Sequence, residues 1–165
     1  MIDELAKVKI GLAMILLLLI FGVGMGISFG VSEDTYKSYI AEGIQEHPDV
    51  HDEKSQDKIW RYAQRAHFHA TGIAAFSLGL VILLMLSGMK ARMKTVSAVL
   101  IGLGGLYPFA WFTMYRLAPS IGRGAAHDHF LTELFTYVGV GCLSLGMIML
   151  IANLFFGLFE EDIGA

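Results

Sequence analysis

The sequence of residues 10–31, IGLAMILLLLIFGVGMGISFGV, contains no charged side chain. About 20 residues of α-helix cross the hydrocarbon core of a bilayer, so this run is long enough to span a membrane. Three further runs of similar length also lack charge, and the predicted spans are residues 10–31, 68–89, 95–115 and 134–159. Helix is the expected form, because a spanning segment must pair its backbone amides internally. The sequence therefore predicts an all-α integral membrane four-helix bundle, folded as a single domain over residues 1–165.

The polar stretch 32–66 predicts a short extramembrane helical loop between the first and second spans. Ser32 is expected to cap a short amphipathic helix at the membrane interface, which ends before Pro48. Pro108 predicts a kink in the third span, whereas residues 118–124, APSIGRG, are expected to form a loop. The first run is expected to be a retained anchor, because it is longer than a usual signal sequence and no small-x-small cleavage site closes it.

The distribution of charge bears on orientation and on partners. Lys90, Arg92 and Lys94 lie in one short loop, on the same side as both termini and without an acidic neighbour. Their density favours cytoplasmic termini, although the opposite side holds more basic residues in total. We therefore expect a protein of the inner or plasma membrane with both termini in the cytoplasm. The net charge of −3 and the lack of a basic tract argue against a nucleic-acid partner.

All six histidines fall on the side opposite the termini. Four of them form two His-x-His pairs at the starts of apolar runs: His67, His69, His127 and His129. Imidazole is a common ligand of haem and of metal ions, so these four are the candidate cofactor ligands. Residues two apart on a helix point in roughly opposite directions, which favours one ligand from each pair. The other two histidines, His47 and His51, are expected to be solvated loop residues.

The histidine pairs predict a site for haem b or for a copper or zinc ion near the outer membrane face. Haem b takes axial ligands from two helices, whereas copper or zinc takes three or four imidazoles, with or without Glu133. Glu133 also lies four residues after His129 and could orient its ring. Arg65 and Arg116 lie near the same end and suit haem propionates or anionic lipid headgroups. The single cysteine, Cys142, excludes a Cys-x-x-Cys-His site for covalent haem.

Small residues at every fourth position, Gly22, Gly26 and Gly30, predict close helix contacts with other membrane subunits or a second copy. No lysine or carboxylate is expected at depth in a span, which disfavours a pump or channel acting alone, and no nucleophile–base set indicates an enzyme.

The architecture resembles small four-span proteins that hold b-type haem or metal and accompany respiratory complexes. We therefore expect an accessory subunit of a redox membrane complex, involved in electron transport through its histidine site. The alternatives are a copper- or zinc-handling membrane protein and a purely structural subunit without cofactor.

Overall fold

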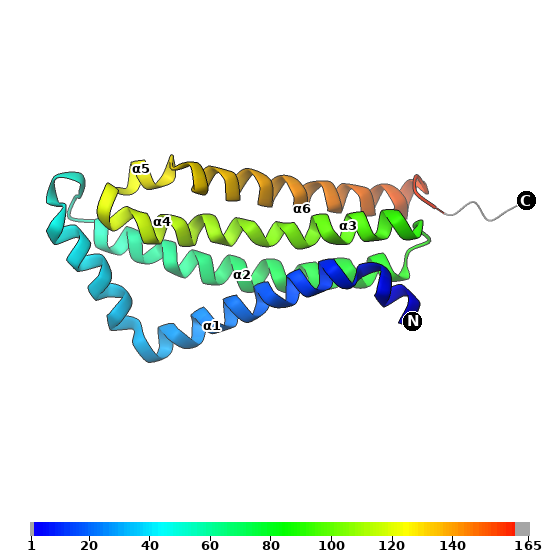
Figure 1. Ribbon diagram of the computed structural model, residues 1–165, viewed down its shortest axis with the longest axis horizontal. Helices are drawn as coiled ribbons and strands as arrows, with labels where there is room; N and C mark the ends of the chain where they lie inside the picture. The colour runs from blue at the N-terminus through cyan, green and yellow to red at the C-terminus, as the bar shows by residue number, and fades with distance from the viewer. Residues whose placement is uncertain (1, 161–165) are drawn as a thin grey trace, which may run out of the picture.

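The computed structural model describes residues 2–160, and this part of the chain is helical apart from short connections. The helices are α1 (Ile2–Glu46), α2 (Ser55–Leu86), α3 (Ala91–Leu103), α4 (Tyr107–Ile121), α5 (Arg123–His127) and α6 (Phe130–Phe156). Two 3-10 turns, η1 (Pro48–Val50) and η2 (Gly104–Leu106), complete the described elements. In Figure 1, α2, α3, α4 and α6 run roughly side by side, whereas α1 lies obliquely to them. The prediction of an all-α chain is confirmed.

Four helical stretches are long and apolar enough to cross a membrane: Asp3–Glu46, Ser55–Leu86, Ala91–Ile121 and Phe130–Phe156. Each contains most of one charge-free run, and together they fit an integral membrane protein. The third stretch combines α3, η2 and α4. The α2–α3 connection lies at the same end as the start of α1, and the α1–α2 and α4–α5 connections lie at the other end (Figure 1). We call the latter the histidine end, because all six histidines belong to the helices and connections that meet there.

Helix α1 bends at Ser32, where φ is −140° and ψ is 32°. This bend coincides with the predicted helix start, so α1 consists of two helical segments that meet at a kink. In Figure 1 the segment after the bend turns back towards the ends of α2 and α4. Its apolar side chains explain why, because Ile40 is fully buried and the Tyr36 ring meets Phe29 edge-on at 4.9 Å between centroids. The Tyr39 hydroxyl also donates a hydrogen bond to the Arg116 carbonyl, at 2.6 Å.

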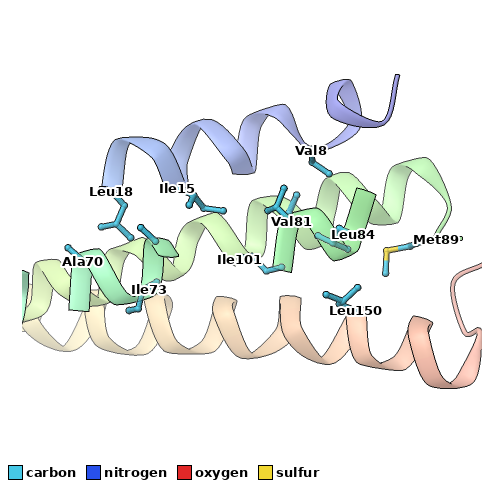
Figure 2. Close-up of a cluster of buried hydrophobic side chains, with 12 residues drawn as sticks. Val8, Ile15, Leu18, Ala70, Ile73, Val81, Leu84, Met89, Ile101 and Leu150 are labelled. Atoms are coloured by element: carbon cyan, nitrogen blue, oxygen red, sulfur yellow. The ribbon is translucent and has the colours of Figure 1, made fainter. Parts of the chain in front are cut away.

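The main hydrophobic core lies between α1, α2 and α3, with Leu150 contributed by α6 (Figure 2). Ile15, Val81 and Ile101 come from three different helices, and each is at most 1% exposed. A second cluster at the histidine end is built around Ile40, Ile59 and Tyr115, with further aromatic rings packed against it. Helix α6 packs chiefly against α3, η2 and α4, so most of its apolar surface faces outwards.

The third spanning stretch is interrupted where the sequence predicts a kink. The 3-10 turn η2 directly precedes Pro108, which occupies the first turn of α4, where its missing amide proton costs little. The predicted loop over residues 118–124 is wrong, because α4 continues through Pro119 to Ile121. Gly43 of α1 leaves room for the Pro119 ring, since a Cβ there would overlap it. The break falls instead at Gly122, whose φ of 81° favours glycine.

Two of the three glycines in the α1 stripe contact α2 of the same chain. A Cβ at Gly22 would lie 2.9 Å from the Thr71 nitrogen, and one at Gly26 would lie 2.7 Å from Cε1 of His67. These two glycines therefore let α1 approach α2 closely. Gly30 has no atom within 4 Å of its Cβ position and is the open member of the stripe.

An ion pair between a buried lysine and a partly exposed glutamate joins the ends of three helices opposite the histidine end. Lys94, assigned to the loop by its sequence, is the fourth residue of α3, and only 4% of its side chain is exposed. Its Nζ lies 2.5 Å from Oε2 of Glu4 on α1 and donates to the Met85 carbonyl of α2 at 3.3 Å. The pair thus ties α1 to the hairpin of α2 and α3.

Removing Glu4 alone is expected to destabilise the protein more than removing both charges. The variant Glu4→Ala leaves the Lys94 ammonium buried with one carbonyl partner, and an unpaired buried charge costs more than the pair contributes. The double variant Glu4→Ala/Lys94→Met replaces that ammonium with an apolar chain of similar length. We expect thermal unfolding in mild detergent to rank the single variant as the least stable. Equal melting temperatures for the two variants would show that Lys94 does not depend on Glu4.

Candidate functional site

His67 has the hydrogen bonding of a ligand imidazole. Its Nδ1 lies 2.7 Å from the Gly22 carbonyl oxygen of α1. A carbonyl only accepts, so Nδ1 carries the proton and the neutral ring keeps its lone pair on Nε2. No hydrogen bond to this Nε2 is formed within residues 2–160. Histidines that bind iron or zinc usually donate their second ring nitrogen to such an oxygen, which fixes the tautomer and the ring orientation.

His67 lies deeper in the bundle than its place at the start of an apolar run suggests. Its neighbours on α1, Gly22 and Gly26, fall inside the charge-free run 10–31. Gly22 lies nine residues before Val31, which corresponds to about 13 Å along a helix. The ring therefore lies beside the apolar part of α1, and not at the edge of its span.

A groove runs along the α1–α2 boundary beside His67. It has a volume of about 280 Å³, and its lining residues are Gly26, Phe29, Gly30, Glu33, Trp60, Gln64, His67 and Phe68. Gly30 thins the α1 side of this groove, because nothing lies within 4 Å of its Cβ position, whereas Gly26 lies against the His67 ring. Phe29 stands edge-on to the His67 ring, at 5.8 Å between centroids. The groove thus combines an imidazole, a flat glycine-lined wall and aromatic neighbours.

His69 faces the other side of α2. Its ring packs against Tyr107 and Trp111 of α4, with centroids 5.0 and 5.8 Å away. The predicted divergence of His67 and His69 is therefore confirmed, because one faces α1 and the other faces α4. Arg65, one turn earlier on α2, places its guanidinium 4.7 Å from the centre of the same Trp111 ring.

The second histidine pair belongs to the junction of α5 and α6, and its members have different roles. His127 is exposed, and its Nδ1 lies 2.7 Å from the Asp128 carboxylate, which leaves Nε2 as the free nitrogen of the neutral ring. His129 caps α6, because its Nδ1 accepts the Leu131 amide proton at 3.2 Å. A ring that accepts at Nδ1 carries its proton on Nε2. His129 therefore caps α6 with Nδ1, and its protonated Nε2 has no lone pair for a ligand bond.

A pocket of about 200 Å³ lies between α4 and α6 beside His127. Its lining residues are Tyr107, Ala110, Trp111, Met114, His127, Thr132, Glu133, Thr136 and Tyr137. Glu133 thus shares a pocket with His127, although the sequence pairs it with His129. His69 borders this pocket indirectly, through its contacts with Tyr107 and Trp111.

The four candidate histidines do not come together at one site in the fold. Among the described residues, no three His, Cys, Asp or Glu side chains come close enough to hold a metal ion. The two predicted propionate partners are also placed elsewhere, since Arg65 covers Trp111 and Arg116 lies 4.6 Å from the Tyr39 ring. Of the two loop histidines, His51 is tied to α4, with its Nε2 3.0 Å from the Pro119 carbonyl, and His47 precedes η1.

Sequence reasoning missed the residues that surround these histidines. Gln64 and Trp60 line the groove because they lie about one and two turns before His67 on α2. No sequence motif singles out Trp111, Tyr107 and Tyr137. The spacing of Tyr107 and Trp111 places both on one face of α4. Only the packing of α4 against α6 shows that they enclose a pocket with Tyr137.

Comparisons with protein-family models, curated proteins and solved structures found no match for this chain.

Proposed function

We propose that the chain is a small accessory subunit of a redox membrane complex that supplies one axial imidazole, His67, to a haem b shared with a partner subunit. The observation that carries this proposal is the hydrogen bond from Nδ1 of His67 to the Gly22 carbonyl, which leaves Nε2 free beside the groove. Haem b supplies one-electron transfer, and the chain itself needs no catalytic residue for this role.

The arrangement of ligands favours haem over a copper or zinc ion at this position. A zinc site takes three or four protein ligands, and beside His67 the groove offers only Glu33, which is already paired with Lys37 at 2.6 Å. Haem needs a single ligand on each face and a flat wall beside it, which Gly30 provides because nothing lies within 4 Å of its Cβ position. The groove is open along one side, so a partner would cover the other face and contribute the second axial ligand.

Residues near the groove can hold the polar edge of the macrocycle. The Gln64 amide and the Trp60 indole line the groove and are hydrogen-bond donors. The Lys37 ammonium lies 5.9 Å from the Trp60 ring and adds positive charge at the same end. These three groups take the role towards propionates that the sequence assigned to Arg65 and Arg116.

In this proposal the protein lies in the inner or plasma membrane with cytoplasmic termini, and the histidine end faces outside. Lys90 in the α2–α3 connection and Arg92 at the start of α3 support this orientation. Partner contacts then use Gly30 and the outward apolar surface of α6, because Gly22 and Gly26 are occupied by α2.

The proposal is tested by purifying the tagged chain from its native membranes in mild detergent. Haem is quantified as the pyridine haemochrome, copper and zinc by elemental analysis, and co-purified subunits by mass spectrometry. We expect b-type haem in a fixed ratio to the chain, together with a membrane partner. Near-stoichiometric copper or zinc without haem would support the metal-handling alternative. A stable partner without haem or metal would support the purely structural one, and either result rejects the proposal.

A further inference from the structure

The pocket between α4 and α6 is a second site, separated from the His67 groove by α2 and α4. Its walls come from two helices that pack directly, and α5, which connects them at the histidine end (Figure 1), contributes His127. Tyr137 stands at its mouth with 72% of the residue exposed. Tyr137 lies seven residues into α6, about 10 Å from the helix start, so the mouth lies within the spanning helix, where ligands arrive from the lipid.

The pocket holds hydrogen-bonding groups that the fold does not use. The indole Nε1 of Trp111 is buried and has no partner among the described residues. The hydroxyls of Tyr107 and Tyr137 also form no hydrogen bond within residues 2–160. A ligand oxygen that reaches these hydroxyls would give them a hydrogen-bond partner. By contrast, the Thr132 and Thr136 hydroxyls are satisfied by backbone carbonyls.

The acceptors of the pocket lie at its polar end. Glu133 offers a carboxylate, and His127 offers Nε2, because Asp128 holds the proton on its Nδ1. A ligand that accepts from the aromatic donors in its oxidised form and donates to these two groups in its reduced form would be matched in both states. A cavity of about 200 Å³ suits one substituted six-membered ring.

Charge at the pocket favours a neutral ligand. The Glu133 carboxylate repels a phosphate headgroup, and no lysine or arginine is among the lining residues. A cation is disfavoured in turn, because Arg65 already holds a positive charge 4.7 Å from the Trp111 ring. An uncharged ring with oxygens on opposite edges satisfies both conditions.

We infer that this pocket binds the headgroup of a lipid-soluble quinone or quinol, with its tail in the bilayer. Tyr107 and Tyr137 donate to the quinone oxygens, the Trp111 ring flanks the headgroup, and Glu133 and His127 accept from the quinol hydroxyls. The inference goes beyond the haem site, because it uses other residues on other helices. It is therefore tested independently of whether haem is present.

The two tryptophans of the chain allow a direct binding experiment. Trp111 lines the pocket, whereas Trp60 lines the groove between α1 and α2. The variant Trp60→Phe leaves Trp111 as the reporter, and Trp111→Phe leaves Trp60 as the matched control. A benzoquinone with a decyl tail is titrated into the full-length protein in detergent, because quinones quench indole fluorescence on contact. We expect saturable quenching of Trp111 and only linear, partition-driven quenching of Trp60.

A pocket-filling variant then locates the binding site. Thr136→Phe places a ring in the cavity, whereas Ser144→Phe, two turns further along α6, places the same ring on an exposed position outside it. We expect the first variant to weaken binding by about tenfold or more and the second to leave it unchanged. Linear quenching of both tryptophans, or equal affinities for the two α6 variants, would overturn the inference. Displacement of the probe by benzyltrimethylammonium would also overturn it, by assigning the pocket to cations.

Discussion

Replacing Gly11 by alanine is expected to destabilise the protein by about 3 kcal/mol, because the added methyl group would meet a neighbouring backbone. A Cβ at Gly11 would lie directly on the carbonyl group of Ala98, so α1 and α3 would have to move apart. The backbone of α3 cannot yield as a flexible side chain does. Gly102, which is on α3 like Ala98, also packs against Gly11. Moving α1 away from α3 would therefore loosen a contact that two glycines make.

The matched control for Gly11 lies on the same helix. Gly24 has no atom within 4 Å of its Cβ position, and alanine is the better helix former, so Gly24→Ala should leave stability unchanged or slightly raised. Helix α6 offers a second pair, because a Cβ at Gly139 would lie 2.5 Å from the Tyr107 nitrogen, whereas Gly141 is open. Thermal unfolding in one detergent should separate the packed glycines from the open ones. Equal shifts for Gly11→Ala and Gly24→Ala would contradict the described α1–α3 contact.

Replacing His67 by alanine is expected to abolish the haem spectrum, because a proposed axial ligand is removed. His69→Ala is the matched control, since it deletes the same ring two residues away, on the face of α2 that packs against Tyr107 and Trp111. We expect this control to retain the Soret and reduced α bands. Visible spectra of the purified variants, at equal protein and with melting temperatures measured alongside, provide the comparison.

A second variant blocks the proposed site while keeping the ligand. Gly26→Leu keeps His67, but its side chain would occupy the position of the imidazole, because even a Cβ there would lie 2.7 Å from Cε1. We expect it to lose haem as well. If the His67→Ala protein keeps its haem while His69→Ala loses it, the ligand lies on the α4 side of α2 and the assignment of His67 is wrong.

The spans were predictable from the sequence because the absence of charge over about 20 residues is a local property. The break before Pro108 was predictable for a similar reason, since proline lacks an amide proton. Pro119 misled the sequence analysis, because its place inside α4 depends on Gly43, which is far away in the chain. The depth of Lys94 likewise depends on Glu4, a partner that charge counting along one loop does not show.

The candidate site was predictable only in part. All four histidines of the two pairs were candidates on sequence grounds, and helical periodicity indicated only that His67 and His69 face different sides of α2. The sequence did not show that the Gly22 carbonyl would fix the His67 ring, or that His129 would cap α6. Those features arise from contacts between helices and from the position of a helix start. The aromatic pocket between α4 and α6 was missed because no motif connects Trp111 with Tyr137.

The most direct test of the proposed role is the dithionite-reduced minus oxidised visible spectrum of the protein purified from its native membranes. Our account predicts a sharp α band and a shifted Soret band typical of six-coordinate haem b, absent from the His67→Ala variant prepared in parallel. A flat difference spectrum from a folded preparation that retains its membrane partner would contradict it.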